Sequence, residues 1–532
     1  MKKIVLSIIM PALLGAYFST ATAQVDKKVL NWYNTEKTGM STEKAYKKSL
    51  KKMTPETVIV AIIDSGIDIN HEDLQGKIWT NTKEIAGNGI DDDGNGYIDD
   101  IHGWNYLGAA DGTNQEHARL EAARIVSMYS EKFEGVEADN VKEADKVDFE
   151  LYTEAAAYVA QNREKYQGYI DQTKQFRDQM LPMLPSMVAS AMGIEEDQLT
   201  LKKVKAWKAK TPQDKQMKQV GVALLSGEVT VEAITEQITQ LEGMLEHHNN
   251  PEYDDRSLIG DDWLDMLDVV YGNNDVKGPD SSHGTHVGGI VGATRGNKLG
   301  GDGVANNVLL MSLRAVPDGD EFDKDIALAI RYAVDNGAKV INGSFGKAFS
   351  TLPEAVYEAI MYAQENDVLF VHAAGNDAKD LAVESNFPAV KYDFQEDPFT
   401  HVLTIGASTR YHDGELAASF SNYGQDQVDI FAPGLEIYNT WPENEYKAIQ
   451  GTSMAAPMVS GVAGLLKGYF PSLTMKEIKD IILASGDDFG ATLQTKPGTD
   501  EKVLFSTLSK TGRVVNVYKA VELAKKVVAN KN

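Results

Sequence analysis

The chain has 532 residues, enough for one large domain with an insertion or for two or three ordinary domains. Its formal net charge is −26 and its isoelectric point is near 4.8, which argues against a nucleic-acid partner because phosphate binding needs clustered lysine and arginine. There is no cysteine, so disulfides, a cysteine nucleophile and lipid attachment through a cysteine are excluded.

The first residues have the three parts of a secretory signal. Met1-Lys2-Lys3 supplies positive charge, residues 4–18 form an apolar run, and Ala21-Thr22-Ala23 is a small-residue cleavage site. A membrane anchor is the alternative, but the apolar run is short and contains a proline. We predict a signal peptide at 1–23 and a secreted product, in the periplasm, at the cell surface or outside the cell. No later stretch is apolar enough to span a bilayer in the mature chain.

Residues 24–56 are polar and rich in lysine, with Asn31-Trp32-Tyr33 as a candidate docking point. Two interpretations stay open for this segment: a short propeptide, or an extension that packs on the following domain.

A buried strand is predicted next, from Val58 to Ile63, because the run is β-branched and apolar throughout. It ends in Asp64. In an α/β sheet such a strand delivers its last residue to the edge where active sites form. The sequence therefore places a carboxylate at that edge.

The loop from Asp91 to Asp100 has the pattern of a calcium-binding loop. Five oxygen donors stand at alternate positions, with Gly96 where such a loop turns tightly, but the expected glutamate at the twelfth position is replaced by His102. A ligand must therefore come from elsewhere, and a solvated acidic loop is the alternative. We favour a structural calcium, because the clustered carboxylates would otherwise repel one another. The predicted ligands are Asp91, Asp93, Asn95, the carbonyl of Tyr97, and Asp99.

A helical insertion is predicted from 114 to 250, where the composition turns to Ala, Glu, Lys, Gln, Met and Leu. Residues 149–180 and 231–247 are its two longest expected helices, and prolines mark breaks between segments. It separates two parts of one domain, 57–113 and 251–532. A lid or substrate-selecting wall and a purely stabilising appendage are both compatible with this insertion.

Three further segments follow the insertion. His283 stands at the start of a helix, and Val368–Ala373 is a strand followed by Ala374-Gly375-Asn376. Strands at 308–316 and 338–345, with a helix at 322–336 between them, predict an α/β fold with a mostly parallel sheet and helices on both faces, plus the all-α insertion.

Ser453 is the candidate nucleophile. It lies in Gly451-Thr452-Ser453-Met454-Ala455-Ala456-Pro457, where small residues let a substrate backbone approach. We expect a helix to begin at the serine with Pro457 in its first turn, so that the positive helix end faces a developing oxyanion. The alternative is that Ser453 has no catalytic role and only caps a buried helix.

Asp64, His283 and Ser453, each with its flanking string and in this order, resemble the subtilisin-like serine peptidases, or subtilases. The resemblance implies a secreted serine endopeptidase acting on polypeptides through an acyl-enzyme. Ser453 would attack the scissile carbonyl, His283 would carry the proton, Asp64 would orient the imidazole, and Asn376 would donate to the oxyanion. His286 resembles the family's second, structural histidine.

The same resemblance implies two further sets of residues. Ser344, Phe345, Gly346 and Asn386 would line the primary specificity pocket. Asp73, with Asn297, Leu299 and Gly301, would form a second calcium site, for which a glycine-rich surface turn is the alternative. An inactive binding protein, a calcium-dependent scaffold, a dedicated processing protease and an exopeptidase remain rival functions.

Overall fold

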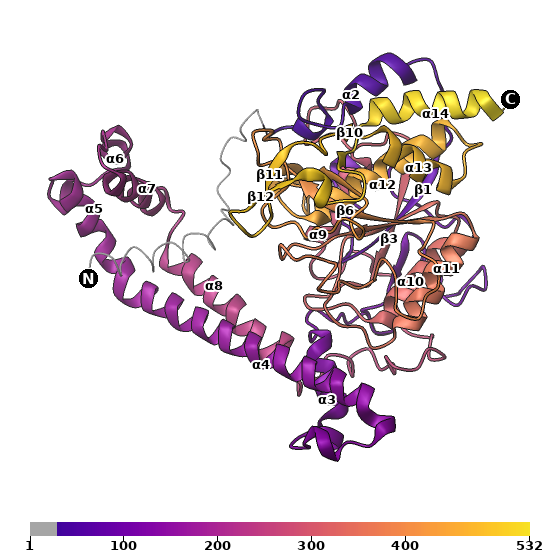
Figure 1. The fold of residues 1–532 in the computed structure, drawn as a ribbon, viewed down its shortest axis with the longest axis horizontal. Coiled ribbons are helices and arrows are strands. Elements are labelled where there is room, and N and C mark those ends of the chain that lie inside the picture. The colour runs from indigo at the N-terminus through magenta and orange to yellow at the C-terminus, as the bar shows by residue number, and fades with distance from the viewer. Residues whose placement is uncertain (1–28, 532) are drawn as a thin grey trace. The chain divides into compact units, whose positions relative to one another are not determined.

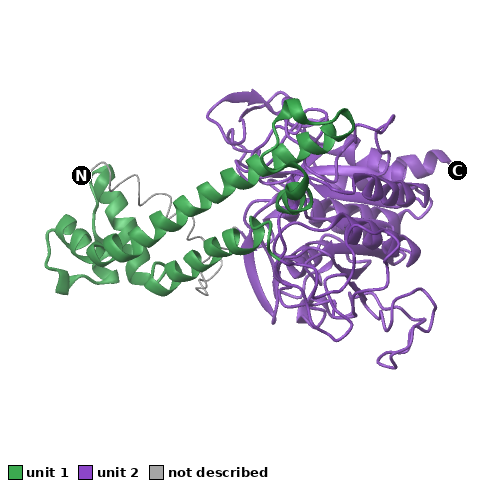
Figure 2. Cartoon of the chain, turned by 90° about the horizontal axis from the view of Figure 1, so that it is seen from below, with its two compact units in different colours: residues 1–25, 122–253 green, residues 26–121, 254–532 purple. Residues whose placement is uncertain are grey.

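The computed structural model describes residues 29–531, so the predicted signal peptide lies outside the described residues. The described chain forms two compact units: residues 122–253 make up the first, and residues 29–121 together with 254–531 make up the second (Figure 2). No helix within residues 29–531 combines the length and apolar character that crossing a membrane requires.

The second unit is built on a nine-stranded sheet with the order β10-β13-β7-β6-β5-β4-β1-β3-β2. All neighbouring strands run parallel except β10 and β13, and β1 pairs with β3 from Val58↔Val308 to Asp64↔Arg314. The strands of this sheet are β1 Val58–Asp64, β2 Gly103–Asn105, β3 Val308–Arg314, β4 Val340–Gly343, β5 Leu369–Ala373, β6 Val402–Ser408, β7 Ile430–Pro433, β10 Asp487–Asp488 and β13 Arg513–Val514. Two hairpins complete the strand set, β8 Ile437–Trp441 with β9 Glu445–Ile449, and β11 Leu493–Thr495 with β12 Lys502–Leu504.

Helices cover both faces of this sheet, which confirms the predicted fold class. Successive residues of β1 point to opposite faces, so Val60 and Ile62 join one core while Ala61 and Ile63 join the other. The first core contains α9 Ser282–Gly292, α12 Thr452–Tyr469, α13 Met475–Ser485 and α14 Val517–Lys531, and the second contains α10 Asp323–Asp335 and α11 Pro353–Glu365. Figure 1 shows α10 and α11 on one side of this unit and α13 and α14 on the other.

The segment before β1 is part of the first core. Trp32 and Tyr33 are 3% and 0% exposed, and Met40 and Leu50 are buried beside the short helix α2 Thr42–Lys44. The Trp32 Nε1 atom donates to the carbonyl of Glu436 at 3.0 Å. The segment is therefore packed as tightly as the strands that follow it.

The first unit is wholly helical. The long α4 lies beside α8, and α5, α6 and α7 enclose a small core that includes Val188, Val204 and Val220 (Figures 1 and 2). Its helices are α4 Lys146–Gln175, α5 Leu184–Met192, α6 Leu201–Ala206, α7 Pro212–Ser226 and α8 Val231–Gly243, and α3 Glu121–Phe133 precedes them. Two predicted helices end in a wider turn: Phe176–Met180 continues α4 and Met244–His248 continues α8, each as a π-helical segment.

Candidate active site

Asp64 and His283 meet at the carboxyl edge of the parallel sheet. Asp64 is the last residue of β1 and is 1% exposed, and His283 lies in the first turn of α9. The Nδ1 atom of His283 donates to Oδ1 of Asp64 at 2.7 Å, and the backbone amide of Ser65 donates to the same oxygen at 2.8 Å. Because this bond fixes Nδ1 as the protonated nitrogen, Nε2 is left as the basic one.

The pKa of His283 lies above its ordinary value of 6.5. Burial lowers it, but the charge of Asp64 and the hydrogen bond to that carboxylate raise it by more, and Asp280 raises it further. The imidazole is therefore a stronger base than an isolated one.

The close approach of α9 to β1 depends on a glycine. A Cβ atom at Gly284 would lie 2.1 Å from the carbonyl oxygen of Gly66 and 3.1 Å from Oδ1 of Asp64. Any side chain there would push the helix, and His283 with it, away from the carboxylate.

Ser453 is the second residue of α12, an 18-residue helix that starts at Thr452. Pro457 therefore lies inside the helix, which makes the expected first-turn position wrong. Since proline has no N–H, the carbonyl of Ser453 receives no bond from that residue. The hydroxyl of Ser344 donates to this carbonyl at 2.9 Å instead, and the Ser453 hydroxyl donates to the Ser344 carbonyl at 3.3 Å.

Asn376 follows β5 and faces the N-terminus of α12. Its Oδ1 atom accepts from the backbone amide of Thr452 at 2.8 Å and from the hydroxyl of Thr452 at 3.0 Å. Both bonds occupy the oxygen, so Nδ2 remains a donor beside the first turn of the helix. The early N–H groups of α12 point the same way, since they have no partner within the helix.

The four predicted pocket residues also come together. A Cβ atom at Gly346 would lie 2.8 Å from Oδ1 of Asn386, so the two positions are in contact. His372, which the sequence reasoning missed, donates from Nε2 to the carbonyl of Phe345 at 2.8 Å, and burial lowers the pKa of His372 to about 4. This neutral histidine fixes the segment that begins at Ser344. Only its place in the strand before Asn376 could have pointed to it.

His286 has a different environment from His283. It is 0% exposed, and its Nε2 atom lies 3.0 Å from the carbonyl oxygen of Ile437 and 3.2 Å from that of Lys447. Burial lowers the pKa of His286 to about 3, so it is neutral at ordinary pH. It ties α9 to the β8–β9 hairpin.

The acidic loop brings together part of its predicted ligand set. Carboxylate oxygens of Asp91 and Asp93 lie within 4.8 Å of each other and of one from Glu84, a residue outside the pattern. Glu84 is 9% exposed, and its Oε2 atom is buried with no partner among the described residues. The carboxylate of Asp99 accepts backbone amides at Gly87, Asn88 and Gly89 instead.

The side chain of Asn95 is engaged at both ends: its Oδ1 atom accepts the backbone amide of Tyr97 at 2.8 Å, and its Nδ2 atom donates to Asp100 at 2.9 Å. The ligand predicted from Tyr97 is its carbonyl oxygen, which leaves its ring to pack on Trp104 and Tyr332.

In the second predicted calcium site, Asp73 contacts Asn297, whose Nδ2 atom is 2.6 Å from Oδ1 of the Asp73 carboxylate. The Asp73 Oδ2 atom is buried and has no partner in the part of the chain described, and burial raises the pKa of Asp73. The backbone amide of Leu299 donates to Oδ1 of Asn297 at 3.1 Å, and Gly301 lies against the carbonyl of Tyr438.

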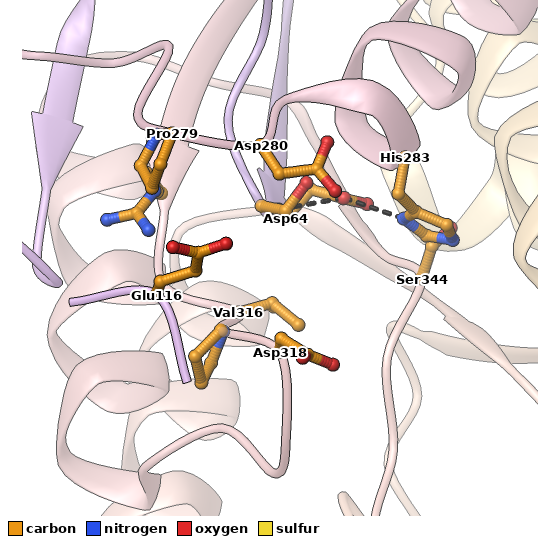
Figure 3. Close-up of a pocket in the computed structure, with 11 residues that line it drawn as sticks. Asp64, Glu116, Pro279, Asp280, His283, Val316, Asp318 and Ser344 are labelled. Carbon is orange, nitrogen blue, oxygen red and sulfur yellow. Dashed lines mark hydrogen bonds and ion pairs between the residues drawn. The ribbon is translucent and has the colours of Figure 1, made fainter. Parts of the chain in front are cut away.

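A cavity of about 320 Å³ adjoins His283, with carboxylates on several sides (Figure 3). Its wall includes His283 and Ser344, so it opens beside the residues described above. The complete wall is formed by Asp64, Ser65, Glu116, Pro279, Asp280, His283, Arg314, Val316, Pro317, Asp318 and Ser344.

Comparison with known proteins identifies the family. A model described as the subtilase family matches residues 56–505. The thermophilic serine proteinase of Bacillus sp. (strain AK1) is 37% identical over 221 residues, which are 41% of this chain and 49% of that protein. Thermitase of Thermoactinomyces vulgaris is 32% identical over 275 residues, 52% of this chain and 84% of thermitase. A cold adapted subtilisin-like serine proteinase of known structure is 28% identical, covers 48% of this chain and 79% of its own, and has a TM-score of 0.36.

The match therefore spans about half the length of the thermophilic proteinase and most of thermitase. The family model covers most of the chain, including the segments that carry Asp64, His283, Asn376 and Ser453. This chain belongs to the subtilase family.

Proposed function

We propose that this protein is a secreted serine endopeptidase that hydrolyses peptide bonds of polypeptide substrates through an acyl-enzyme. The observation that carries the proposal is the 2.7 Å bond from His283 Nδ1 to Asp64 at the sheet edge. Ser453, at the start of α12, is linked to the same place through Ser344, which lines the cavity beside His283. A base oriented by a carboxylate, next to an accessible serine, is the arrangement that activates a hydroxyl for acyl transfer.

In the proposed reaction, the Ser453 hydroxyl turns from the Ser344 carbonyl toward Nε2 of His283. Nε2 takes the proton as Oγ attacks the scissile carbonyl, and the resulting imidazolium gives the proton to the leaving amine. Water then attacks the acyl-enzyme by the same route. Asp64 keeps its bond to Nδ1 throughout and stabilises the imidazolium.

The oxyanion would be held by Nδ2 of Asn376 and the backbone amide of Ser453. Support comes from the two bonds that fix Oδ1 of Asn376 to Thr452, because they leave the amide nitrogen as the free end of the side chain. Loss of one such donor costs about 10²–10³ in turnover in related chemistry.

We also propose that Glu84, Asp91 and Asp93 hold a structural calcium ion. The residues fit such an ion because three carboxylates meet there and one oxygen of Glu84 is buried without a donor. Asp73 and Asn297 are the second candidate, supported by the unpartnered Oδ2 of Asp73. A bound calcium would neutralise these carboxylates and stiffen the loops. The reaction steps above do not involve it.

Reaction with a fluorophosphonate probe tests the proposed nucleophile. The mature chain should be labelled, Ser453→Ala should not, and Asp64→Asn should react much more slowly because the imidazole loses its orienting partner. Ser226→Ala, which changes an exposed serine in the helical unit, is the matched control and should label normally. Labelling that persists in Ser453→Ala, or a wild-type chain that neither labels nor cleaves peptides, would refute the proposal.

A further inference from the structure

The cavity beside His283 combines apolar walls with an acidic rim. Pro279, Val316 and Pro317 supply apolar surface, while the side chains of Glu116, Asp280 and Asp318, labelled in Figure 3, supply carboxylates to the lining. With Asp64 the lining contains four carboxylates in all, and Arg314 supplies one guanidinium. The lining therefore has a formal charge of −3 when the imidazole of His283 is neutral.

The single cation on this wall is already engaged. Arg314 is 2% exposed, and its guanidinium donates to Asn105 at 2.9 Å, to the carbonyl of Leu107 at 3.3 Å and to that of Gln115 at 2.6 Å. Burial lowers the pKa of Arg314 to about 10. These bonds hold the guanidinium in place, and from there its charge acts on two of the rim carboxylates, Glu116 and Asp280.

The rim carboxylates are less completely engaged. Asp280 accepts the amide of Ser282 at 2.8 Å, and Asp318 accepts from Nδ1 of His117 at 2.9 Å, but both residues are exposed. Glu116 is exposed; its backbone carbonyl accepts the amide of Asp318 at 2.9 Å, and its carboxylate makes no hydrogen bond or ion pair within residues 29–531. The carboxylates of Glu116 and Asp280 each retain an acceptor position for a ligand.

Two deeper atoms on the same wall lack a hydrogen-bond partner among the described residues, which is a second and independent indication that a ligand with N–H groups binds here. The Oδ2 atom of Asp64 and the Oγ atom of Ser65 are buried, and neither has a partner within the described chain. A buried acceptor without a donor costs free energy, so a ligand that brings N–H groups into the cavity would be favoured there.

We propose that this cavity binds a lysine or arginine side chain of the substrate, and that Glu116, Asp280 and Asp318 determine this specificity. The inference rests on the proposed peptidase function. A long cationic side chain matches the cavity in both respects, because its methylene stem packs on proline and valine while its head group meets carboxylates. An acidic side chain would be repelled by the formal charge of the lining, and an apolar one would leave the rim unpaired.

A peptide series measures this preference directly. Lysine, arginine, methionine and glutamate are placed in turn at each position around the scissile bond, and kcat/KM is measured at low salt. At one position, the wild-type chain should favour lysine or arginine over methionine by on the order of tenfold. High salt should reduce that ratio, because a partly exposed charge interaction is screened.

Variants of Glu116 test the contribution of this residue to the preference. Glu116→Gln keeps the shape and should lower the lysine-to-methionine ratio several-fold, and Glu116→Arg should shift the preference at that position toward glutamate. Asp480→Asn removes an exposed carboxylate on α13, away from the cavity wall, and should leave the ratio unchanged.

Two results would overturn the proposal. One is a wild-type chain that labels at Ser453 and cleaves peptides but shows no preference for lysine or arginine at any position. The other is a preference that Glu116→Gln and Glu116→Arg leave intact, in variants that still label with the probe. A chain that neither labels nor cleaves would instead refute the peptidase function, and this proposal with it.

Discussion

Replacement of Trp32 by alanine tests whether the segment before β1 is a permanent part of the fold. The indole is 3% exposed in the same core as α12, and its Nε1 atom donates to the Glu436 carbonyl at 3.0 Å. Truncating a buried tryptophan costs about 3–5 kcal/mol, and a lost hydrogen bond adds about 1 kcal/mol. We therefore expect Trp32→Ala to destabilise the catalytic unit by about 4 kcal/mol or more.

The measurement is unfolding in urea, followed together with thermal unfolding of the same samples. A loss of this size should lower the melting temperature by roughly 5 °C, because the entropy of unfolding grows with the size of the unit. Leu30→Ala is the matched control, since Leu30 belongs to the same segment but is 43% exposed, and its cost should stay within about 0.5 kcal/mol.

A removable propeptide would behave differently. If residues 29–56 only covered a finished catalytic unit, then Trp32→Ala would leave unfolding unchanged and would raise activity by weakening the cover. That combination would refute the argument from burial. Tyr33 gives a second check, because it is 0% exposed and its hydroxyl bonds the Asp302 carbonyl and Nδ2 of Asn439, both at 3.1 Å.

Three other outcomes follow from the site. Asp280 is one of the groups that raise the pKa of His283, so Asp280→Asn should lower that pKa; because the neutral imidazole is the active form, the acidic limb of kcat/KM should move to lower pH in a pH-rate profile. Glu84→Gln should remove most of the increase in melting temperature that added calcium produces, as measured by scanning calorimetry with and without chelator, whereas Asp480→Asn should leave that increase intact. Ser344→Ala removes the donor to the Ser453 carbonyl, and we expect a loss of about 1 kcal/mol in stability with a several-fold lower kcat at little change in KM.

The end of β1 could be predicted from the sequence because a strand that is buried on both faces appears as an uninterrupted run of apolar residues. The run before Asp64 is apolar at every position, and in the structure it forms the interior strand β1, which ends at that residue. Helix bounds in the other unit were less exact. The expected helix at 149–180 begins at Lys146 and passes into a π-helical segment at Phe176, and no residue pattern in the sequence distinguishes that change of hydrogen bonding.

Ligands that come from outside the acidic loop could not be predicted, for a different reason. Glu84 lies before the acidic loop and outside its alternating pattern, so only the folded chain brings its carboxylate to Asp91 and Asp93. The spacing also placed Asp99 among the ligands, whereas the backbone at Gly87 to Gly89 captures that carboxylate with three amides. Local spacing cannot decide between a cation and nearby N–H groups, because both satisfy the same oxygens.

The position of Pro457 within α12 explains how Ser453 is connected to Ser344, the residue that follows β4. Had Pro457 stood in the first turn of α12, every carbonyl of that turn would have found a helical amide. Because Pro457 lies further inside the helix, the Ser453 carbonyl has no helical amide to accept from. The hydroxyl of Ser344 donates to this carbonyl, and the same hydroxyl oxygen accepts a hydrogen bond from Nδ2 of Asn342 at 2.9 Å. Asn342 is held in turn by Ser460, which donates to Oδ1 at 2.8 Å. A missing N–H in one helix thus ties the serine that we propose as nucleophile to the strand that leads into the predicted substrate pocket, so a change in either element alters the position of both.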